Sequence, residues 1–362
     1  MSITDITHCR LHNQQIAITK FKKAKDIISW MGVMQAQDYH MSKWAVGIRL
    51  PSATEKIIEA AIHKGEILRT HLLRPTWHLV TAEDIYWMLA LSAPKLKALV
   101  KARHKETGLT PAVLRKTNSI IEKALTKHGH LTREELLQEF KKAKIAVDNN
   151  RSSHIFFWAE MEGLICSGSL KEKEPTYALL QEWVPKKKEL KKEEAIALLA
   201  QKYFNSHGPA TLSDFVWWSG LNITTARQGL EAIKDQLQEE KISGQSYWLP
   251  PSLAVPPKKQ NSVYLLPAYD EYIISYKDRS AMYPGDLKKF AVSNNGYFRP
   301  VIVVNGQVTG IWKRTVQKGK LLVEAQFFKA VPKAIQPLVT KAGKAYGDFL
   351  NQSTEVKQSV IN

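Results

Sequence analysis

Cysteine is scarce in this 362-residue sequence, and no run of apolar residues is long enough to cross a bilayer. The two cysteines, Cys9 and Cys166, lie far apart and neither belongs to a Cys-x-x-Cys pair, which excludes a disulfide framework and a thiolate metal site. A membrane-spanning helix needs about 18 consecutive apolar residues, and the N-terminal segment lacks the apolar core of a secretory signal. We therefore expect a reduced, cytoplasmic protein with no membrane partner.

Several catalytic motifs are also absent. The sequence has no Gly-rich phosphate-binding loop, no Gly-x-Ser-x-Gly turn and no His-Glu-x-x-His motif. His63, His71 and His78 are spaced by eight and seven residues, which suits a pair of metal ligands neither on a helix nor on a strand. His128 and His207 lie at predicted helix ends, where we expect capping rather than catalysis. The sequence thus predicts no metal and no other cofactor.

Acidic residues are few relative to basic ones. Lys and Arg total 52 against 34 Asp and Glu, which gives a formal net charge of +18 and a pI near 9.6. Such an excess favours a polyanionic partner, nucleic acid before an anionic membrane surface. The alternative is a set of scattered lysines that serve only solubility, and the lysine-rich stretch 186–192 fits a solvated linker.

A pattern of three helices followed by a two-stranded ribbon occurs twice. Each copy has a His-Gly dipeptide, with the glycine at 129 or 208, after an amphipathic helix. Thr132 and Thr211 are then suited to cap the next helix. A third helix and two short extended segments complete each copy, which is the layout of a winged helix-turn-helix module.

The first hundred residues fit a third, more diverged copy. We expect its first helix over 24–34, directly before Gln35-Ala36-Gln37, and further helices over 42–49 and beyond 52. A hairpin over 67–80 then turns around Leu73-Arg74-Pro75, and helices from Glu83 and from Pro94 lead into the next copy.

After Trp248 the composition changes. Two Pro-Pro pairs within 250–257 indicate a linker, and Asn305-Gly306 is the strongest short signal for a tight hairpin. The remaining elements are expected strands over 263–266, 272–276, 301–304, 307–312 and 321–327 and a helix over 332–350. The predicted fold class is α+β, with three tandem winged helix-turn-helix modules and a C-terminal β-barrel-like domain with a terminal helix. The expected domains are 1–108, 109–185, 186–255 and 256–362.

Acidic side chains offer few candidates for general acid–base chemistry. Asp270, Glu271 and Asp278 flank the segment 272–277, and Asp278 with Arg279 fits a structural ion pair or a turn cap. Asp38 is either a general base or a solvated helix cap. On residue type alone, Gln35 and Gln37 fit polar positions at a helix end.

Four segments, taken together and in order, carry more information than any one of them. They are Gln35-Ala36-Gln37, LRPTWHLV at 73–80, LPAYDEYIISYKDR at 266–279 and VVNGQVTGIWKR at 303–314. Over nearly the whole chain they resemble the AlkZ/YcaQ family of bacterial DNA glycosylases. The resemblance implies tandem winged helices and a C-terminal β-barrel that frame a basic channel for duplex DNA.

Within that family, the resemblance assigns catalysis to Gln35 and Gln37. A Gln-x-Gln motif is typical of the AlkZ branch and Gln-x-Asp of the YcaQ branch, so this chain is similar to the former. Asp38 is one residue out of register with the YcaQ aspartate. Asp38, Asp270, Asp278 and Arg279 remain candidates for supporting the active site.

The implied activity is that of a monofunctional glycosylase, a monomer associated with the nucleoid, which excises N3- or N7-alkylated purines from double-stranded DNA. Unhooking of interstrand cross-links is a further activity that the resemblance leaves open. The alkylated base is already cationic and leaves without protonation, so two amides can suffice to hold water and stabilise an oxocarbenium-like sugar. The preferred lesion stays open.

Contacts to DNA are expected from the first hairpin, the third helices and the C-terminal ribbon. The candidates are Arg69, Arg74, Trp77, His78, Arg151, Arg227, Lys234, Lys313 and Arg314, and Trp77 fits a core position equally well. The alternative function is a non-catalytic winged-helix regulator or architectural factor, which would need no glutamine pair. A peripheral membrane protein is a more distant alternative, because no apolar face opposes the lysines.

Overall fold

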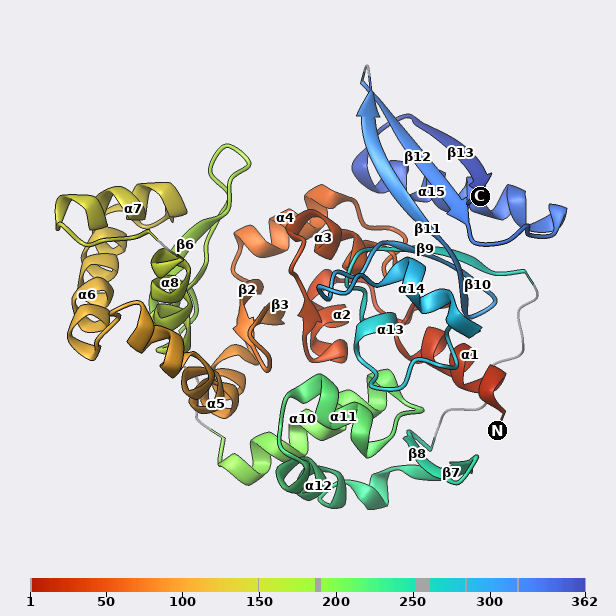
Figure 1. Cartoon of the computed structure of the whole chain (residues 1–362), viewed down its shortest axis with the longest axis horizontal. Helices are drawn as coiled ribbons and strands as arrows, with labels where there is room; N and C mark the ends of the chain where they lie inside the picture. The colour runs from red at the N-terminus through yellow and green to blue at the C-terminus, as the bar shows by residue number, and fades with distance from the viewer. Residues whose placement is uncertain are drawn as a thin grey trace. The chain divides into compact units, whose positions relative to one another are not determined.

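The computed structural model describes residues 2–148, 150–185, 190–251, 261–283, 285–317 and 319–361. The chain forms two compact units (Figure 1), one made of Met1–Glu59 with Ile196–Asn362 and the other of Ala60–Ala195. Among the described residues, no helix combines the length and hydrophobicity that crossing a membrane requires. Lys186–Lys188 and most of the proline-rich linker fall outside the described residues.

The unit Ala60–Ala195 contains a hairpin, a long helix and a helical module with its own small sheet. Its elements are β2 (Ile67–Leu72), β3 (Thr76–Thr81), α5 (Ile85–Glu106), α6 (Pro111–His128), β4 (Leu131–Thr132), α7 (Arg133–Lys142), α8 (Arg151–Met161), β5 (Ile165–Ser167), β6 (Thr176–Leu179) and α9 (Leu180–Trp183). β6 pairs antiparallel with both β4 and β5.

Packing in this unit matches the predicted order of three helices and a ribbon. The apolar faces of α6, α7 and α8 meet in one core, in which Ile121, Leu136 and Phe156 are almost fully buried. Gly129 ends α6 with a positive φ of 72°, and Thr132 caps α7. The number of winged-helix modules in the whole chain, and the four-domain division, remain predictions.

The other unit holds both ends of the chain. Its elements are α1 (Ile3–Asn13), α2 (Ala24–Met31), β1 (Met34–Gln35), α3 (Tyr39–Gly47), α4 (Glu55–His63), α10 (Lys192–His207), α11 (Leu212–Ser219), α12 (Ile223–Glu231), η1 (Lys234–Gln236), β7 (Gln238–Ile242), β8 (Gln245–Leu249), β9 (Val263–Leu266), α13 (Glu271–Ile274), η2 (Gly285–Leu287), α14 (Lys288–Ala291), β10 (Val301–Val304), β11 (Gln307–Gln317), β12 (Lys320–Phe327), η3 (Lys333–Ile335), α15 (Gln336–Leu350) and β13 (Thr354–Val360). The boundaries between the units fall within α4 and α10.

Five strands form the sheet of the C-terminal region, in the order β13-β12-β11-β10-β9. Asn305 and Gly306, both at positive φ, turn β10 into β11 as the dipeptide predicts. β13 pairs parallel with β12, and α15 packs against β9 and β13. The expected β-barrel is therefore an open sheet in the described residues, with β9 and β13 as separate edges (Figure 1).

Helix α3 fastens the N-terminal segment to this sheet. The indole Nε1 of Trp44 donates a hydrogen bond of 2.8 Å to the carbonyl oxygen of Leu265 in β9. The Trp44 ring lies 5.1 Å from that of Tyr346 in α15. Only glycine fits at position 47, because a Cβ there would lie 2.5 Å from the ring of Phe349. These contacts hold the C-terminal half of α3, a helix whose capping residue, Asp38, follows Gln35-Ala36-Gln37 directly.

Three predicted elements were wrong. The segment 272–276 is not a strand, because Asp270 caps a short helix there, α13. The helices expected from Glu83 and from Pro94 are one helix, α5, which contains Pro94. The helix expected over 24–34 ends at Met31, where Gly32 at φ 80° reverses the chain and β1 begins two residues later. Gln35 is thus on a strand, and not at a helix end.

The cap of α7 gives a test of this architecture. Thr132 Oγ1 accepts the Glu135 backbone N–H at 3.2 Å, and the Glu135 carboxylate accepts the Thr132 backbone N–H at 2.8 Å. We expect Thr132→Ala to lower the free energy of unfolding by about 1 kcal/mol in urea denaturation. Thr126→Ala, on the exposed face of α6, is the matched control and should be neutral or slightly stabilising. Equal losses in both variants would contradict the capping role.

Candidate active site

The Gln35-Ala36-Gln37 segment joins β1 to α3. Gln35 is 8% exposed and Ala36 is fully buried, whereas Gln37 is exposed. The carboxylate of Asp38 then caps α3 by accepting the Met41 backbone N–H at 3.0 Å. Asp38 is therefore a helix cap, one of the two roles that its sequence position allows. A buried strand on one side and a capped helix on the other hold the two glutamines in a defined backbone path.

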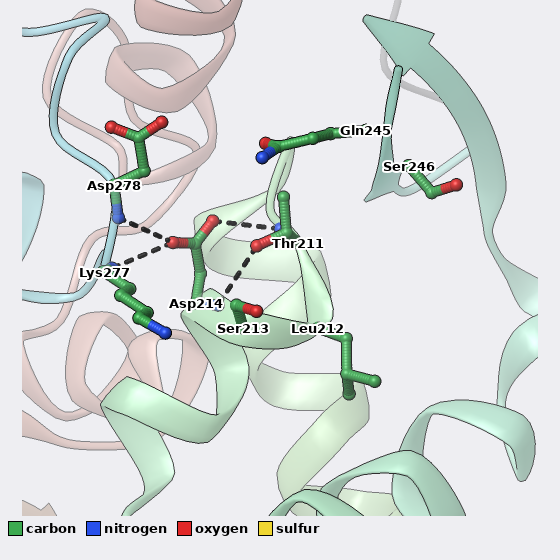
Figure 2. Close-up of a pocket in the computed structure, with 8 residues that line it drawn as sticks. All are labelled: Thr211, Leu212, Ser213, Asp214, Gln245, Ser246, Lys277 and Asp278. Atoms are coloured by element: carbon green, nitrogen blue, oxygen red, sulfur yellow. Dashed lines mark hydrogen bonds between the residues drawn. The ribbon is translucent and has the colours of Figure 1, made fainter. Parts of the chain in front are cut away.

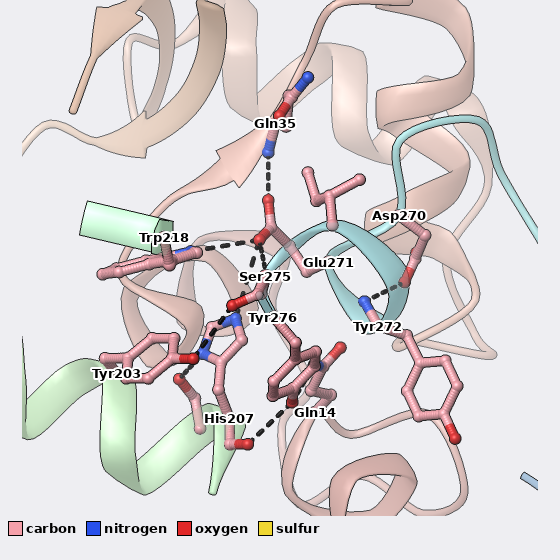
Figure 3. Close-up of polar contacts among 12 residues, drawn as sticks. Gln14, Gln35, Tyr203, His207, Trp218, Asp270, Glu271, Tyr272, Ser275 and Tyr276 are labelled. Atoms are coloured by element: carbon pink, nitrogen blue, oxygen red, sulfur yellow. Dashed lines mark hydrogen bonds and ion pairs between the residues drawn. The ribbon is translucent and has the colours of Figure 1, made fainter. Parts of the chain in front are cut away.

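A buried carboxylate anchors this segment from the far end of the sequence. The backbone N–H of Gln35 donates a hydrogen bond of 2.6 Å to Oε1 of Glu271, and the rest of Gln35 extends away from the carboxylate (Figure 3). Oε2 of Glu271 accepts the Trp218 indole N–H at 3.2 Å and the Ser275 hydroxyl. Glu271 is 1% exposed. Charge-assisted hydrogen bonds are stronger than neutral ones, so this contact fixes the peptide of Gln35 rather than its side chain.

His207 lies beside this carboxylate. Its Nε2 is 3.8 Å from Glu271 Oε2, and its Nδ1 is 2.7 Å from the Ser206 hydroxyl oxygen. The imidazole stacks on the ring of Tyr203 with centroids 4.9 Å apart. Burial lowers the pKa of His207 below its usual value, so the ring is neutral at pH 7. His207 is in the last turn of α10, as expected, but it is fully buried rather than an exposed cap.

A second buried carboxylate, Asp270, has a structural partner. Arg49 donates two hydrogen bonds to its carboxylate, at 2.8 and 2.9 Å, and a third of 2.9 Å to Gln14 Oε1. Asp270 also accepts the Tyr272 backbone N–H at 2.9 Å and so begins α13. Arg49 and Asp270 thus position α13, from which Glu271 reaches β1.

Asp278 and Arg279 lie at a different part of this unit. Asp278 Oδ1 accepts the Ser280 backbone N–H at 2.9 Å, which confirms the expected turn cap. Asp278 also lines a cavity of about 530 Å³ at the start of α11, where Asp214 accepts the backbone N–H groups of Lys277 and Asp278 (Figure 2). Arg279 donates to the carbonyl oxygen of Ile273 at 2.7 Å. In the described residues, no group of three or more His, Cys, Asp or Glu side chains is placed to hold a metal ion.

The hairpin candidates belong to the unit Ala60–Ala195 and differ in exposure. His78 is fully buried, with Nδ1 2.9 Å from the carbonyl oxygen of Thr76, so burial limits its access to a ligand. Arg69 places its guanidinium 4.0 Å from the centre of the half-buried Trp77 ring. Arg74 is partly buried in the turn. Arg151, at the start of α8, donates to the carbonyl oxygens of Ala146 and Thr107.

The remaining basic candidates belong to the other unit. Arg227 is exposed on α12, and Lys234 lies 3.6 Å from Glu231 in a surface ion pair. On the β11–β12 hairpin, Lys313 is 3.3 Å from Glu324 in a second surface ion pair, and Arg314 donates to the hydroxyl of Tyr346. Exposed pairs of this kind are weak and screened by salt, so both lysines can exchange their partners for phosphate.

Glu271 is one of the acidic candidates in the sequence, but its sequence position indicates no role for it. Its partners Trp218, Ser275 and His207 were not associated with the site. The available signal was the run Asp270-Glu271-Tyr272 directly after a strand, which places a carboxylate at the start of a helix. Which groups the carboxylate meets depends on α10, α11 and β1, and no local pattern specifies those contacts.

The lowered pKa of His207 gives a pH prediction. Because the unfolded chain binds a proton near pH 6.5 and the folded protein binds it only at lower pH, the free energy of unfolding should fall as pH decreases below about 6.5. Burial also lowers the pKa values of His104, His130 and His154. These three histidines therefore also lower the free energy of unfolding as the pH decreases. We expect the free energy of unfolding, measured by urea denaturation, to decline less steeply between pH 7.5 and 5 in His207→Gln than in wild type. The exposed His128→Gln should match wild type, and identical slopes in all three proteins would contradict this assignment.

Comparison with known proteins agrees with this fold. A family model described as DNA glycosylase AlkZ-like matches residues 28–349. A curated relative, the interstrand DNA cross-link repair glycosylase of Streptomyces sahachiroi, is 22% identical over 320 residues, which are 84% of this chain and 85% of that protein. The solved structure of Streptomyces sahachiroi DNA glycosylase AlkZ superposes with a TM-score of 0.80 at 19% identity, over 100% of both chains. On the family match, which includes the glutamine segment and most of the chain, this protein belongs to the AlkZ-like DNA glycosylases.

Proposed function

We propose that this DNA glycosylase hydrolyses the N-glycosidic bond of N3- or N7-alkylated purines in duplex DNA, and that Gln35 and Gln37 perform the chemistry. The observation that carries the proposal is the anchored glutamine segment. Its backbone is bound to buried Glu271 at 2.6 Å, while Gln37 reaches solvent. A rigid backbone that carries one buried and one exposed amide suits a site that must hold a water molecule and a sugar in fixed positions.

The substrate supplies much of the driving force. Alkylation at N3 or N7 gives the purine a positive charge, so the base departs as a neutral molecule without protonation by an acid. The bond to the sugar then breaks with positive charge developing on the sugar ring. A strong general acid is therefore unnecessary, and this accounts for a site built around amides.

Two tasks remain for the protein. One amide oxygen can accept a hydrogen bond from the attacking water and direct it at the anomeric carbon. The negative ends of the amide dipoles can stabilise the cationic sugar, because preorganised dipoles need no reorientation when charge develops. Water attacks the anomeric carbon, the bond to the base breaks, and the water proton is released to solvent. No covalent intermediate with the protein is required.

The buried groups behind the glutamines support this geometry. Glu271 holds the Gln35 peptide, Asp270 with Arg49 holds the helix that carries Glu271, and Asp38 begins the helix after Gln37. We assign these carboxylates positioning roles. Asp278 caps a separate turn. Arg279 supports the site indirectly, because it donates to the carbonyl oxygen of Ile273 in α13.

The range of substrates extends to cross-linked purines in this proposal. The relative from Streptomyces sahachiroi is named an interstrand DNA cross-link repair glycosylase. A purine alkylated at N7 by one arm of a bifunctional agent has the same cationic leaving group as a methylated one. We infer that the protein acts on both, as a monomer on DNA in the cytoplasm.

The first test is base release from a duplex containing one N7-methylguanine. The double variant Gln35→Ala, Gln37→Ala should release base about 10²–10³-fold more slowly than wild type, because it lacks the preorganised dipoles. The variant should fold, since the contact between residue 35 and Glu271 uses the backbone. Single-turnover kinetics at saturating enzyme separate this loss from weaker binding.

Gln181→Ala is the control for this experiment, because Gln181 is exposed on α9. It should leave the rate of release unchanged. Undiminished release by the double variant would refute the catalytic role of the glutamines. If wild type bound the duplex but released neither this base nor a nitrogen-mustard adduct, the proposed substrate class would be wrong.

Contacts to phosphate are assigned to the basic side chains of the module helices and ribbons. These are Arg69, Arg74, Arg151, Arg227, Lys234, Lys313 and Arg314. We expect Arg227→Gln to weaken binding of any duplex and to reduce the slope of log Kd against log salt concentration by about 1, because one fewer counterion is released. Lys357→Gln, on the exposed edge strand β13 and paired with Glu355 at 3.5 Å, should keep the wild-type slope. Equal slopes for wild type and Arg227→Gln would exclude this phosphate contact.

A further inference from the structure

The unit Ala60–Ala195 contains a small cavity that the proposed chemistry does not use. It has a volume of about 250 Å³ and is lined by side chains of the β2–β3 hairpin, α8 and β6, with Arg133 of α7 among them. Three of the aromatic lining residues are Trp77, Phe157 and Tyr177. Typical sites for drug-sized ligands have about 300–1,000 Å³, so this cavity has room for one ring system but not for a whole nucleotide cofactor.

Aromatic rings and the guanidinium of Arg133 line the cavity. The rings of Phe156 and Tyr177 stack in parallel with centroids 4.8 Å apart, and the guanidinium of Arg133 lies 4.7 Å from the centre of Phe156. The indole of Trp77 is half-buried, and the cation of Arg69 stacks on it. Aromatic and guanidinium planes are the groups on which unpaired nucleobases stack in proteins that bind them.

One polar group at the cavity is held in a fixed orientation. Oε2 of the fully buried Glu160 accepts the backbone N–H of His71 at 2.9 Å and lies 2.8 Å from His71 Nδ1. The carboxylate therefore favours the tautomer with its proton on Nδ1, which leaves Nε2 as an acceptor in the neutral ring. His71 lines the cavity and is 14% exposed. An imidazole acceptor of this kind can read the exocyclic amino group of a base.

The other oxygen of this carboxylate has an unusual environment. Glu160 Oε1 is buried and has no hydrogen-bond partner in the part of the chain that the structure describes. Leaving a buried polar atom unsatisfied costs free energy, and such exceptions call for an explanation. The carboxylate of Glu160 orients His71, and this explains why a carboxylate is present here despite the cost. A core that served packing alone would not need it.

The ring of His71 lies 4.1 Å from that of Trp77 and 4.9 Å from that of Phe157. We propose that this cavity binds a single nucleobase that has left the DNA helix, by stacking against the exposed part of Trp77 and by hydrogen bonding to His71. Arg133, whose Nη2 donates to Ser152 and Ser153 at 2.9 and 3.1 Å, lies where it can contact the phosphate of that nucleotide. The proposal rests on the DNA binding of the proposed function, but not on catalysis by the two glutamines. Because a base leaves the helix most easily where pairing is already disturbed, the site recognises damaged positions.

The test compares two duplexes of the same sequence, one fully paired and one with a single bulged 2-aminopurine. Wild type should bind the bulged duplex roughly tenfold more tightly, as expected when one base gains an aromatic stack. The fluorescence of 2-aminopurine should fall on binding, because Trp77 stacks on it. Trp77→Leu should lose both effects, and its affinity should fall more for the bulged duplex than for the paired one.

Two pairs of variants, each with one substitution inside the cavity and a control outside it, test whether the effect is specific to the cavity. Ser152 and Ser153 both accept from Arg133, but only Ser153 lines the cavity. Ser153→Tyr should fill the cavity and abolish the preference for the bulge, whereas Ser152→Tyr should keep it. Trp158, which packs against the same core as Trp77 but does not line the cavity, gives the control Trp158→Leu. Ser153 is exposed, so its variant should fold even if Trp77→Leu does not.

The outcomes separate this proposal from the glutamine chemistry. No preference for the bulge in wild type, or a preference that survives in Ser153→Tyr, would overturn the nucleobase site. Base release without such a preference would support catalysis by the glutamines and count against the nucleobase site. A preference for the bulge without base release would support the nucleobase site and count against the catalytic proposal. Failure to bind either duplex would overturn both.

Discussion

The contact between Glu271 and the backbone of Gln35 is the constraint on which the candidate active site depends. It joins residues 236 positions apart, so it closes a very long loop and has to be supported by other interactions. The support comes from the aromatic core of α10 and α11, where Tyr203 lies 4.9 Å from Trp218, and from the bidentate pair of Arg49 with Asp270. Apolar burial stabilises the fold, and the buried carboxylate then selects one position for the glutamine segment within it.

The two units use the same physical device. In each, a fully buried glutamate accepts a backbone N–H of a strand residue and lies beside a histidine: Glu271 with Gln35 and His207, and Glu160 with His71. Burying a carboxylate is costly unless several hydrogen bonds satisfy it. The gain is orientation, because a charged acceptor fixes the direction of its donor more strongly than a neutral one. In both units the oriented group belongs to a segment to which we assign contact with DNA.

The electrostatics of the surface and of the interior have different functions. The net charge of +18 favours association with any DNA, irrespective of its sequence or damage. Selection of damage has to come from short-range groups, and the chain offers amides at Gln35 and Gln37 and the aromatic ring of Trp77. A cationic lesion removes the need for a strong acid, and this explains how a DNA glycosylase can use amides. Long-range attraction and local recognition are thus assigned to separate residues.

Helix caps and tight turns could be predicted from the sequence alone. Thr132 and Thr211 cap their helices, Asn305-Gly306 forms its hairpin, and the two modules follow the repeat, because helix caps and tight turns depend on a few neighbouring residues. The glutamine motif was also visible, through its family resemblance. The buried contacts of the glutamine segment depend on the tertiary structure. The segment 272–276 is rich in β-forming residues, but its first three residues are helical. The polar strand β13 pairs in parallel with β12. In both cases partners distant in sequence outweigh local propensity. For the same reason, the position of Glu271 beneath Gln35 and of Glu160 behind His71 could emerge only from the folded chain.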